Sequence, residues 1–369
     1  MKTWSLNQIG QLNNEQKDKT VPGDDECIVK VSACGICGSD IPRVYQTGAH
    51  KMPLIIGHEF AGEIAEIGSD DAVGLKVGDK VGIFPLIPCM ECGPCKMKKY
   101  EMCRNYSYLG SRCDGGFAEY VAVPKKNIIE LPDNVDMRAA AMLEPMAVAV
   151  HACRQIGLLP GNIDEHTEEN SGKSSSKNPD KSELIVICGM GTIGLLVLMF
   201  LLEAGYTNIT VIGNREIQRS KAVELGLDRE RFIMLGESGD LDSAERIASL
   251  QADYYFECVG KQETYAQAIN HTAPAGKVCL VGNPYGDMEL PRDIYWKILR
   301  NQLTVTGTWN SSFTGEANDD WHYVVKRLET GAIHPEKLIT HAYGIDDIIK
   351  GFELMRDKSE DYIKVMMVI

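Results

Sequence analysis

The segment LIVICGMGTIGLLVLMFLLEAG, residues 184–205, constrains the fold more than any other part of the sequence. An apolar strand leads into Gly189-x-Gly191-x-x-Gly194, and an apolar helix follows. The first glycine permits the turn, the second lets backbone approach a pyrophosphate, and the third packs helix on strand. We predict dinucleotide binding here, with Thr192 and Ile193 among the contacts. A tight turn without a ligand is the alternative.

Residues 183–308 repeat this alternation of strands and helices. Six buried-type strands are expected, at LIVIC, ITVI, RFIML, DYYFECV, KVCLVG and LTVTGT. Such a rhythm predicts an α/β domain with a doubly wound parallel sheet over residues 151–308. Residues 161–182 are polar and nearly free of large apolar side chains, which indicates a loop or disordered insert.

The first 150 residues have a different character. Short β-rich runs such as CIVKVSA, LIIGHEFAGEIAEIG and FAEYVAV alternate with turn residues, which predicts an irregular β-barrel. The helical DWHYVVKRLETG and the apolar YIKVMMVI are expected to return to it. We therefore predict one domain from residues 1–150 and 309–369, with the parallel-sheet domain inserted. Two domains suit a chain of 369 residues.

Charge and hydropathy exclude several classes of partner. A net charge of −14 would be repelled by nucleic acids and by anionic membranes. The longest apolar run has about half the length that a bilayer requires. A cytoplasmic location follows as an expectation, and thiols stay reduced there.

Four of the twelve cysteines form one compact motif. Cys89, Cys92, Cys95 and Cys103 have the spacing C-x2-C-x2-C-x7-C, within a lobe at about residues 87–104. Four thiolates complete the tetrahedron of a closed, structural zinc site. An iron–sulfur cluster is the nearest alternative, and two disulfides are another.

A second set of residues predicts an open metal site. Cys37 lies in CGICGSD, His58 and Glu59 lie in GHEF, and Glu144 lies in LEPMAVAVHA. A thiolate, an imidazole and a carboxylate leave one position for water or substrate, as in catalytic zinc sites. Taken singly, each has a structural explanation: a core thiol, a turn residue or a charge at a helix start.

The end of the second strand of the parallel sheet bears on cofactor choice. An acid normally stands there to hold the adenosine ribose. Here the sequence has Gly213, followed by Asn214 and Arg215, with Arg219 one helical turn further on. Without a carboxylate at position 213, a 2′-phosphate is not repelled there and Arg215 can pair with it, so we predict NADP(H). The alternative is NAD(H), with Arg215 a solvated surface charge and Glu216 or Asn214 binding the ribose.

The order of CGICGSD, GHEFAGEI, the cysteine lobe, GSRCDGGFAEY, LEPMAVAVHA and GMGTIG resembles the zinc-dependent medium-chain dehydrogenases, in their polyol branch. The resemblance implies a GroES-like catalytic domain, a Rossmann domain, and a catalytic and a structural zinc ion. It implies that Cys37, His58 and Glu144 hold the catalytic zinc, with Glu59 an adjustable ligand. Ser39 would accept the substrate proton. The next relay residue would be a histidine in classical alcohol dehydrogenases, but this chain has Pro42.

The segments CGSDIPRVYQTGAHKMPLIIGHEF, GSRCDGGFAEY and KILRNQLTVTGTW resemble members of that branch that act on polyol phosphates. The implied reaction interconverts a secondary alcohol, as in galactitol 1-phosphate, and a ketose phosphate. A homodimer or homotetramer is expected by analogy. Alternatives are a pentitol phosphate, an unphosphorylated alditol such as sorbitol, or a non-catalytic NADP(H)-binding sensor. The candidate substrate contacts are Arg43, His50, Lys51, Arg112, Trp309 and Asn310.

Overall fold

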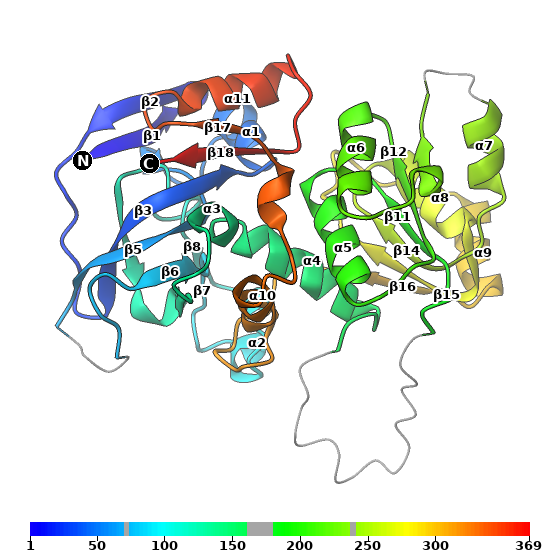
Figure 1. The fold of residues 1–369 in the computed structure, drawn as a ribbon, viewed down its shortest axis with the longest axis horizontal. Coiled ribbons are helices and arrows are strands. Elements are labelled where there is room, and N and C mark those ends of the chain that lie inside the picture. The colour runs from blue at the N-terminus through cyan, green and yellow to red at the C-terminus, as the bar shows by residue number, and fades with distance from the viewer. Residues whose placement is uncertain (70–73, 161–179, 237–240) are drawn as a thin grey trace, which may run out of the picture. The chain divides into compact units, whose positions relative to one another are not determined.

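The computed structural model describes residues 1–69, 74–160, 180–236 and 241–369, which form two compact units (Figure 1). Unit 1 comprises Met1–Pro145, Ser312–Glu316 and Trp321–Ile369. Unit 2 comprises Met146–Ser311 and Ala317–Asp320. The predicted polar insert lies outside the described residues except for 180–182.

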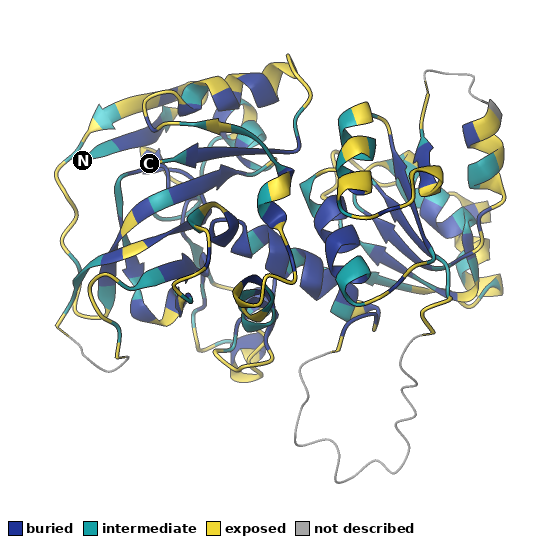
Figure 2. Ribbon diagram, in the orientation of Figure 1, coloured by how far each residue is buried: buried dark blue, intermediate teal, exposed yellow. Residues whose placement is uncertain are grey.

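Unit 2 is built on a six-stranded sheet in the order β13-β12-β11-β14-β15-β16, and every pairing is parallel. All six predicted strands are present, which confirms the doubly wound sheet. Its central strands are buried (Figure 2), as expected where helices cover both faces of a sheet. The strands are β11 (Ile185–Cys188), β12 (Ile209–Gly213), β13 (Phe232–Met234), β14 (Ala252–Glu257), β15 (Thr272–Leu280) and β16 (Thr304–Gly307).

The helices of unit 2 connect these strands. α5 (Thr192–Glu203) is buried continuously from Gly194 to Leu201, because its apolar side chains lie against the sheet. α4 (Leu143–Gln155) begins in unit 1 and continues into unit 2. The other helices are α6 (Glu216–Glu224), α7 (Leu241–Ala248), α8 (Gln262–Asn270) and α9 (Arg292–Arg300).

Unit 1 is β-rich, as predicted. Its largest sheet has the order β10-β6-β5-β3-β18-β17, with β9 also paired to β3. Among the described strands this path does not close on itself, so the predicted barrel is an open arrangement of sheets. The strands are β1 (Lys2–Gln8), β2 (Gln11–Gln16), β3 (Glu26–Ile36), β4 (Leu54–Ile55), β5 (Glu59–Ile67), β6 (Lys80–Ile83), β7 (Leu86–Ile87), β8 (Ser107–Tyr108), β9 (Tyr120–Pro124), β10 (Ile128–Glu130), β17 (Ile339–Tyr343) and β18 (Lys364–Val368).

The late strand β18 pairs antiparallel with β3, so the C-terminal segment lies in unit 1. The predicted helix near residue 320 is α10 (Asp320–Glu329). Within the described ranges, no helix combines the length and apolarity needed to cross a bilayer. The remaining helices of unit 1 are α1 (Asp40–Pro42), α2 (Gly93–Lys96), α3 (Met137–Ala140) and α11 (Ile348–Asp357).

Candidate active site

Antiparallel pairing brings Cys37 and His58 together in unit 1. β3 ends at Ile36 and β5 begins at Glu59, and Gly35 pairs with Glu59 in the register of the two strands. Residues just beyond these ends therefore meet at one sheet edge. Glycine at position 35 leaves space for the Glu59 carboxylate, because a Cβ atom there would lie 2.3 Å from Glu59 Oε2.

The ligand-type atoms of Cys37, His58 and Glu59 all lie within 4.8 Å of one another. Ligands on one tetrahedral zinc ion are about 3.3–3.8 Å apart at ordinary Zn–N and Zn–S lengths, so the cluster is compact enough for one ion. Burial acts to lower the pKa of His58, but Asp40 and Cys37 outweigh it and hold that pKa well above its ordinary value. The site therefore attracts cations.

Asp40, which the sequence analysis missed, organises this cluster. It is fully buried; its Oδ2 accepts a hydrogen bond from the Cys37 amide at 3.0 Å, and its Oδ1 lies 3.5 Å from His58 Nδ1. Burial acts to raise the pKa of Asp40, but His58, Arg43 and the Cys37 amide outweigh it, so that pKa is lowered. With Nδ1 facing a carboxylate, Nε2 of His58 is the atom suited to a metal. An acid three residues after a candidate ligand cysteine is the signal that could have identified it.

Lys364 is a second buried residue that sequence reasoning missed. From β18 it donates hydrogen bonds to Glu59 and to the Ile36 carbonyl, the latter at 3.1 Å. Its side chain and that of Glu59 are 2% and 3% exposed. The carboxylate of Glu59 is thus held by a charged partner inside the protein.

Glu144 lies beside the three-residue cluster rather than within it. It stands in the first turn of α4, and Tyr108 Oη donates a hydrogen bond to its Oε1 at 3.1 Å. Burial raises the pKa of Glu144 to about 7, while His58 opposes the shift and Glu59 adds to it. Glu144 therefore lies close enough to His58 and Glu59 for their charges to change its pKa.

Three other predicted residues lie near the cluster or connect to it. Ser39 Oγ donates a hydrogen bond to Cys37 Sγ at 3.2 Å. Arg43 donates to the carboxylate of Asp40. Arg112 stacks on the Tyr106 ring at 4.4 Å, and Tyr106 contacts Tyr108 edge to face.

The remaining substrate candidates are exposed or belong to unit 2. His50 and Lys51 are exposed on the surface of unit 1. Trp309, 54% exposed, and Asn310, which has a φ of 52°, lie in unit 2.

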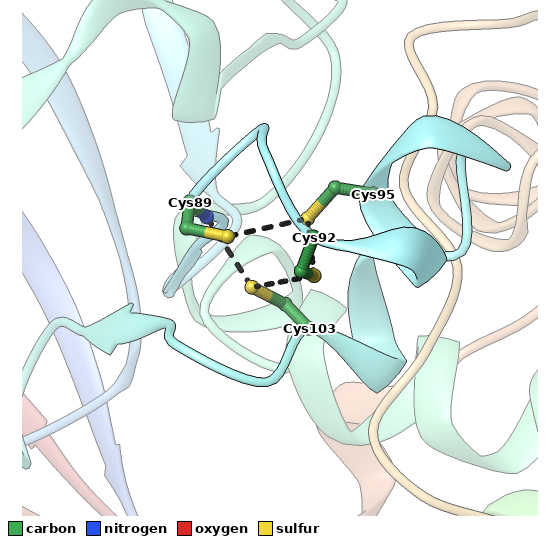
Figure 3. Close-up of side chains that lie close together, drawn as sticks. All are labelled: Cys89, Cys92, Cys95 and Cys103. Atoms are coloured by element: carbon green, nitrogen blue, oxygen red, sulfur yellow. Dashed lines mark hydrogen bonds between the residues drawn. The ribbon is translucent and has the colours of Figure 1, made fainter.

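Four cysteine sulfurs converge in the lobe around α2 (Figure 3). The Sγ–Sγ separations are 3.5 Å for Cys92–Cys95, and 3.9 Å for both Cys89–Cys95 and Cys92–Cys103. A tetrahedral ion with Zn–S bonds of about 2.3 Å requires about 3.8 Å between sulfurs. Disulfides are excluded at these distances, and a multi-iron cluster would place the sulfurs on separate irons, further apart. The lobe fits one tetrahedral ion.

The thiols of this lobe also differ in their pKa values. Backbone amides of Arg104 and Cys95 lower the pKa of Cys92 to about 6. Burial, followed by the neighbouring thiols, raises the pKa of Cys95 to about 12. A thiolate is therefore readily available as the first ligand, and a bound cation would stabilise the others.

In unit 2, the three glycines of the strand–helix turn have the predicted kinds of environment. Gly189 has a φ of 95°, and a Cβ on Gly194 would lie 2.0 Å from the Gly189 carbonyl oxygen. A Cβ on Gly191 would meet nothing within 4 Å. Gly191 precedes α5, so the amides of Thr192 and Ile193 open the helix beside free space, which suits an anion.

Two side chains lie where a side chain at the end of β12 would begin. A Cβ at Gly213 would lie 2.5 Å from Phe232 Cζ and 2.7 Å from Gln218 Oε1. Asn214 is exposed, and Arg215 precedes α6. Arg219 donates two hydrogen bonds to Glu216. Gln218, unlike the arginines, was not identified from sequence.

Comparisons with known proteins agree with both units. The alcohol dehydrogenase GroES-like domain family matches residues 23–133, and the zinc-binding dehydrogenase family matches residues 192–330. The galactitol 1-phosphate 5-dehydrogenase of Escherichia coli strain K12 is 33% identical over 324 residues, 86% of this chain and 85% of the relative.

Solved structures extend the similarity over the whole chain. The galactitol-1-phosphate dehydrogenase of Escherichia coli aligns with a TM-score of 0.85 and 28% identity, over 100% of both chains. A zinc-binding dehydrogenase from Sinorhizobium meliloti, solved bound to NADP, aligns with a TM-score of 0.83 and 27% identity, over 100% of this chain and 99% of its own. The resemblance seen in the sequence is confirmed: the protein belongs to the zinc-dependent medium-chain dehydrogenases, as an NAD(P)-dependent enzyme of their alcohol and polyol branch.

Proposed function

We propose that this enzyme transfers hydride between a secondary alcohol of a polyol phosphate and NADP(H), giving a ketose phosphate. The cluster of Cys37, His58 and Glu59 carries the proposal, because its three ligand-type atoms lie within 4.8 Å of one another, a spacing that supports binding of one metal ion. The similarity to galactitol 1-phosphate 5-dehydrogenase supports galactitol 1-phosphate as the first substrate to test.

Cys37, His58 and Glu144 are the proposed holders of a catalytic zinc ion, with Glu59 as an adjustable ligand. When bound, zinc supplies Lewis acidity, which lowers the pKa of an alcohol. Asp40 orients the His58 ring, and Lys364 compensates the charge of Glu59 whenever that carboxylate is not a ligand. This division explains why Glu59 belongs to the cluster yet is already paired with Lys364.

Ser39 is the proposed acceptor of the substrate proton. Its hydroxyl lies 3.2 Å from Cys37 Sγ, and it can accept one hydrogen bond while donating another. Pro42 offers no side-chain proton carrier, so the onward path is proposed to use water or a ribose hydroxyl of the cofactor.

The four-cysteine lobe is proposed to hold a structural zinc ion. Its sulfur separations, 3.5–3.9 Å, carry this assignment. Four sulfurs leave no position for substrate, so the lobe serves the fold.

NADP(H) is the proposed cofactor because the acid that would hold the ribose is missing and its space is filled. Arg215 is the proposed partner of the 2′-phosphate. Arg219 is engaged by Glu216, so its contribution would require that pair to open.

Arg43 and Arg112 are the proposed anchors of the substrate phosphate. Both connect to the cluster of Cys37, His58 and Glu59. Arg43 does so through Asp40, and Arg112 does so through the Tyr106–Tyr108 contact. His50, Trp309 and Asn310 remain proposed pocket residues. A homo-oligomer in the cytoplasm is proposed on family analogy alone.

Initial rates with galactitol 1-phosphate and free galactitol, each with NADP and NAD, test the proposal directly. We expect turnover that requires both the phosphate and NADP. Equal rates with the free polyol would instead identify an alditol dehydrogenase. Cys37→Ser should abolish turnover and leave nucleotide binding intact, since the nucleotide loop lies in the other unit.

A further inference from the structure

Gln218 has a well-defined position at the end of β12. Its Oε1 accepts hydrogen bonds from the amides of Asn214 at 2.9 Å and Arg215 at 3.2 Å. Because both partners are N–H donors, this atom must be the oxygen of the carboxamide. The nitrogen Nε2, which can only donate, has no hydrogen-bond partner among the residues that the structure describes.

Gln218 also fills the space that an acid on β12 would need. A Cβ at Gly213 would lie 2.7 Å from Gln218 Oε1. On the other side it would lie 2.5 Å from Cζ of Phe232, which is 3% exposed and belongs to the neighbouring strand β13. A neutral amide thus stands where a dinucleotide-binding sheet usually presents a carboxylate.

We propose that Gln218 determines the choice of nucleotide, a role that rests on the proposed preference for NADP(H). The hydrogen bonds from two amides occupy Oε1, so it is a poor acceptor for the ribose hydroxyls of NAD(H). The free Nε2 donor suits a phosphate oxygen. Gln218 therefore favours a 2′-phosphorylated adenosine in two ways: it supplies a donor, and it adds no negative charge.

The charges nearby strengthen this assignment. Glu216 is exposed, but it accepts two hydrogen bonds from Arg219 and lies 3.6 Å from Arg229. The two arginines therefore offset the negative charge of Glu216. A new carboxylate at position 218 would lie closer to the backbone amides of Asn214 and Arg215.

Gln218→Glu tests the proposal with nearly unchanged shape. A carboxylate can keep both amide hydrogen bonds, but it repels a 2′-phosphate and removes the Nε2 donor. Dissociation constants for NADPH and NADH are measured by nicotinamide fluorescence, and the constant for 2′,5′-ADP by calorimetry. We expect NADPH and 2′,5′-ADP to bind at least about tenfold more weakly, as for loss of a charge-assisted hydrogen bond. NADH should bind within about twofold of wild type.

Ser220→Glu is the matched control, because Ser220 is exposed on the same helix. It adds the same charge at a different position and should leave the ratio of the dissociation constants for NADPH and NADH unchanged. An equal loss of NADPH binding in this control would overturn the role of position 218. So would an unchanged ratio in Gln218→Glu.

Wild-type binding separates this inference from the proposed cofactor preference. If wild type prefers NADH, the preference itself is refuted, and the inference fails with it. If wild type prefers NADPH and Gln218→Glu keeps that ratio, only the inference fails. Should Gln218→Glu not fold, Gln218→Met removes the donor without adding charge. It should weaken the binding of NADPH about threefold or more and leave the binding of NADH unchanged. Equal weakening of the binding of both nucleotides would refute the proposal.

Discussion

Gly191 and Gly194 are three positions apart, yet alanine should affect them in different ways. A Cβ at Gly194 would lie 2.0 Å from the backbone oxygen of Gly189, whereas ordinary contacts begin at 3.4 Å. The strand or the helix must therefore move by more than an ångström. A Cβ at Gly191 would meet nothing within 4 Å.

The magnitude follows from two opposing contributions. Forcing a methyl group into a packed contact costs about 3 kcal/mol, at the upper end of the usual range. Replacing glycine by alanine inside a helix recovers about 1 kcal/mol. Gly194→Ala should therefore lose about 2 kcal/mol of unfolding free energy, and its Tm should fall by about 4–8 °C for a unit of this size.

Gly191→Ala should keep the wild-type Tm and lose affinity for NADPH, by about tenfold or more, because its methyl group blocks the approach of the pyrophosphate to the backbone. Thermal melts of the nucleotide-free protein and fluorescence titrations with NADPH measure both effects. A wild-type Tm in Gly194→Ala, or an unstable Gly191→Ala that binds normally, would refute the assignment of packing to one glycine and binding to the other.

Three further substitutions test the metal sites. Cys92→Ser should remove one zinc ion per chain by elemental analysis and lower the Tm, and retention of all metal would contradict a four-sulfur site. Asp40→Asn should weaken zinc at the catalytic site about 10–100-fold in chelator competition by releasing the His58 ring, with the cysteine lobe as an internal control. Lys364→Met leaves Glu59 buried without its partner and should cost about 3–5 kcal/mol in urea unfolding. Adding Glu59→Gln should recover part of that loss, and no recovery would mean that Lys364 acts by packing alone.

The features that could be predicted from the sequence depend on residues that lie close together along the chain. The strand–glycine–helix turn and the cysteine lobe each depend on spacing within a short segment, because backbone geometry fixes their shape. Cys37 and His58 were grouped by their ligand chemistry and by family resemblance, because no local spacing connects them. The structure supplies the reason: the ends of β3 and β5 are antiparallel neighbours.

The residues that sequence missed act across long separations or through local packing without a recognisable spacing. Lys364 and Glu59 are 305 positions apart, so no local pattern connects them. Tyr108 reaches Glu144 from 36 positions away. Gln218 lies close to Gly213 in sequence, but its importance depends on the Phe232 ring, which a neighbouring strand supplies. Such contacts follow from tertiary structure rather than from motif.

The pairing of β3 with β18 has a consequence for biosynthesis. The Lys364–Ile36 contact joins residues 328 positions apart, so the central sheet of unit 1 stays incomplete until β18 has left the ribosome. The strands of unit 2 are contiguous between residues 185 and 307 and can pair earlier. The cysteine lobe closes over only 14 positions, whereas the neighbourhood of Glu59 needs Lys364. The four sulfurs of the cysteine lobe can therefore come together earlier in synthesis than the residues around Glu59.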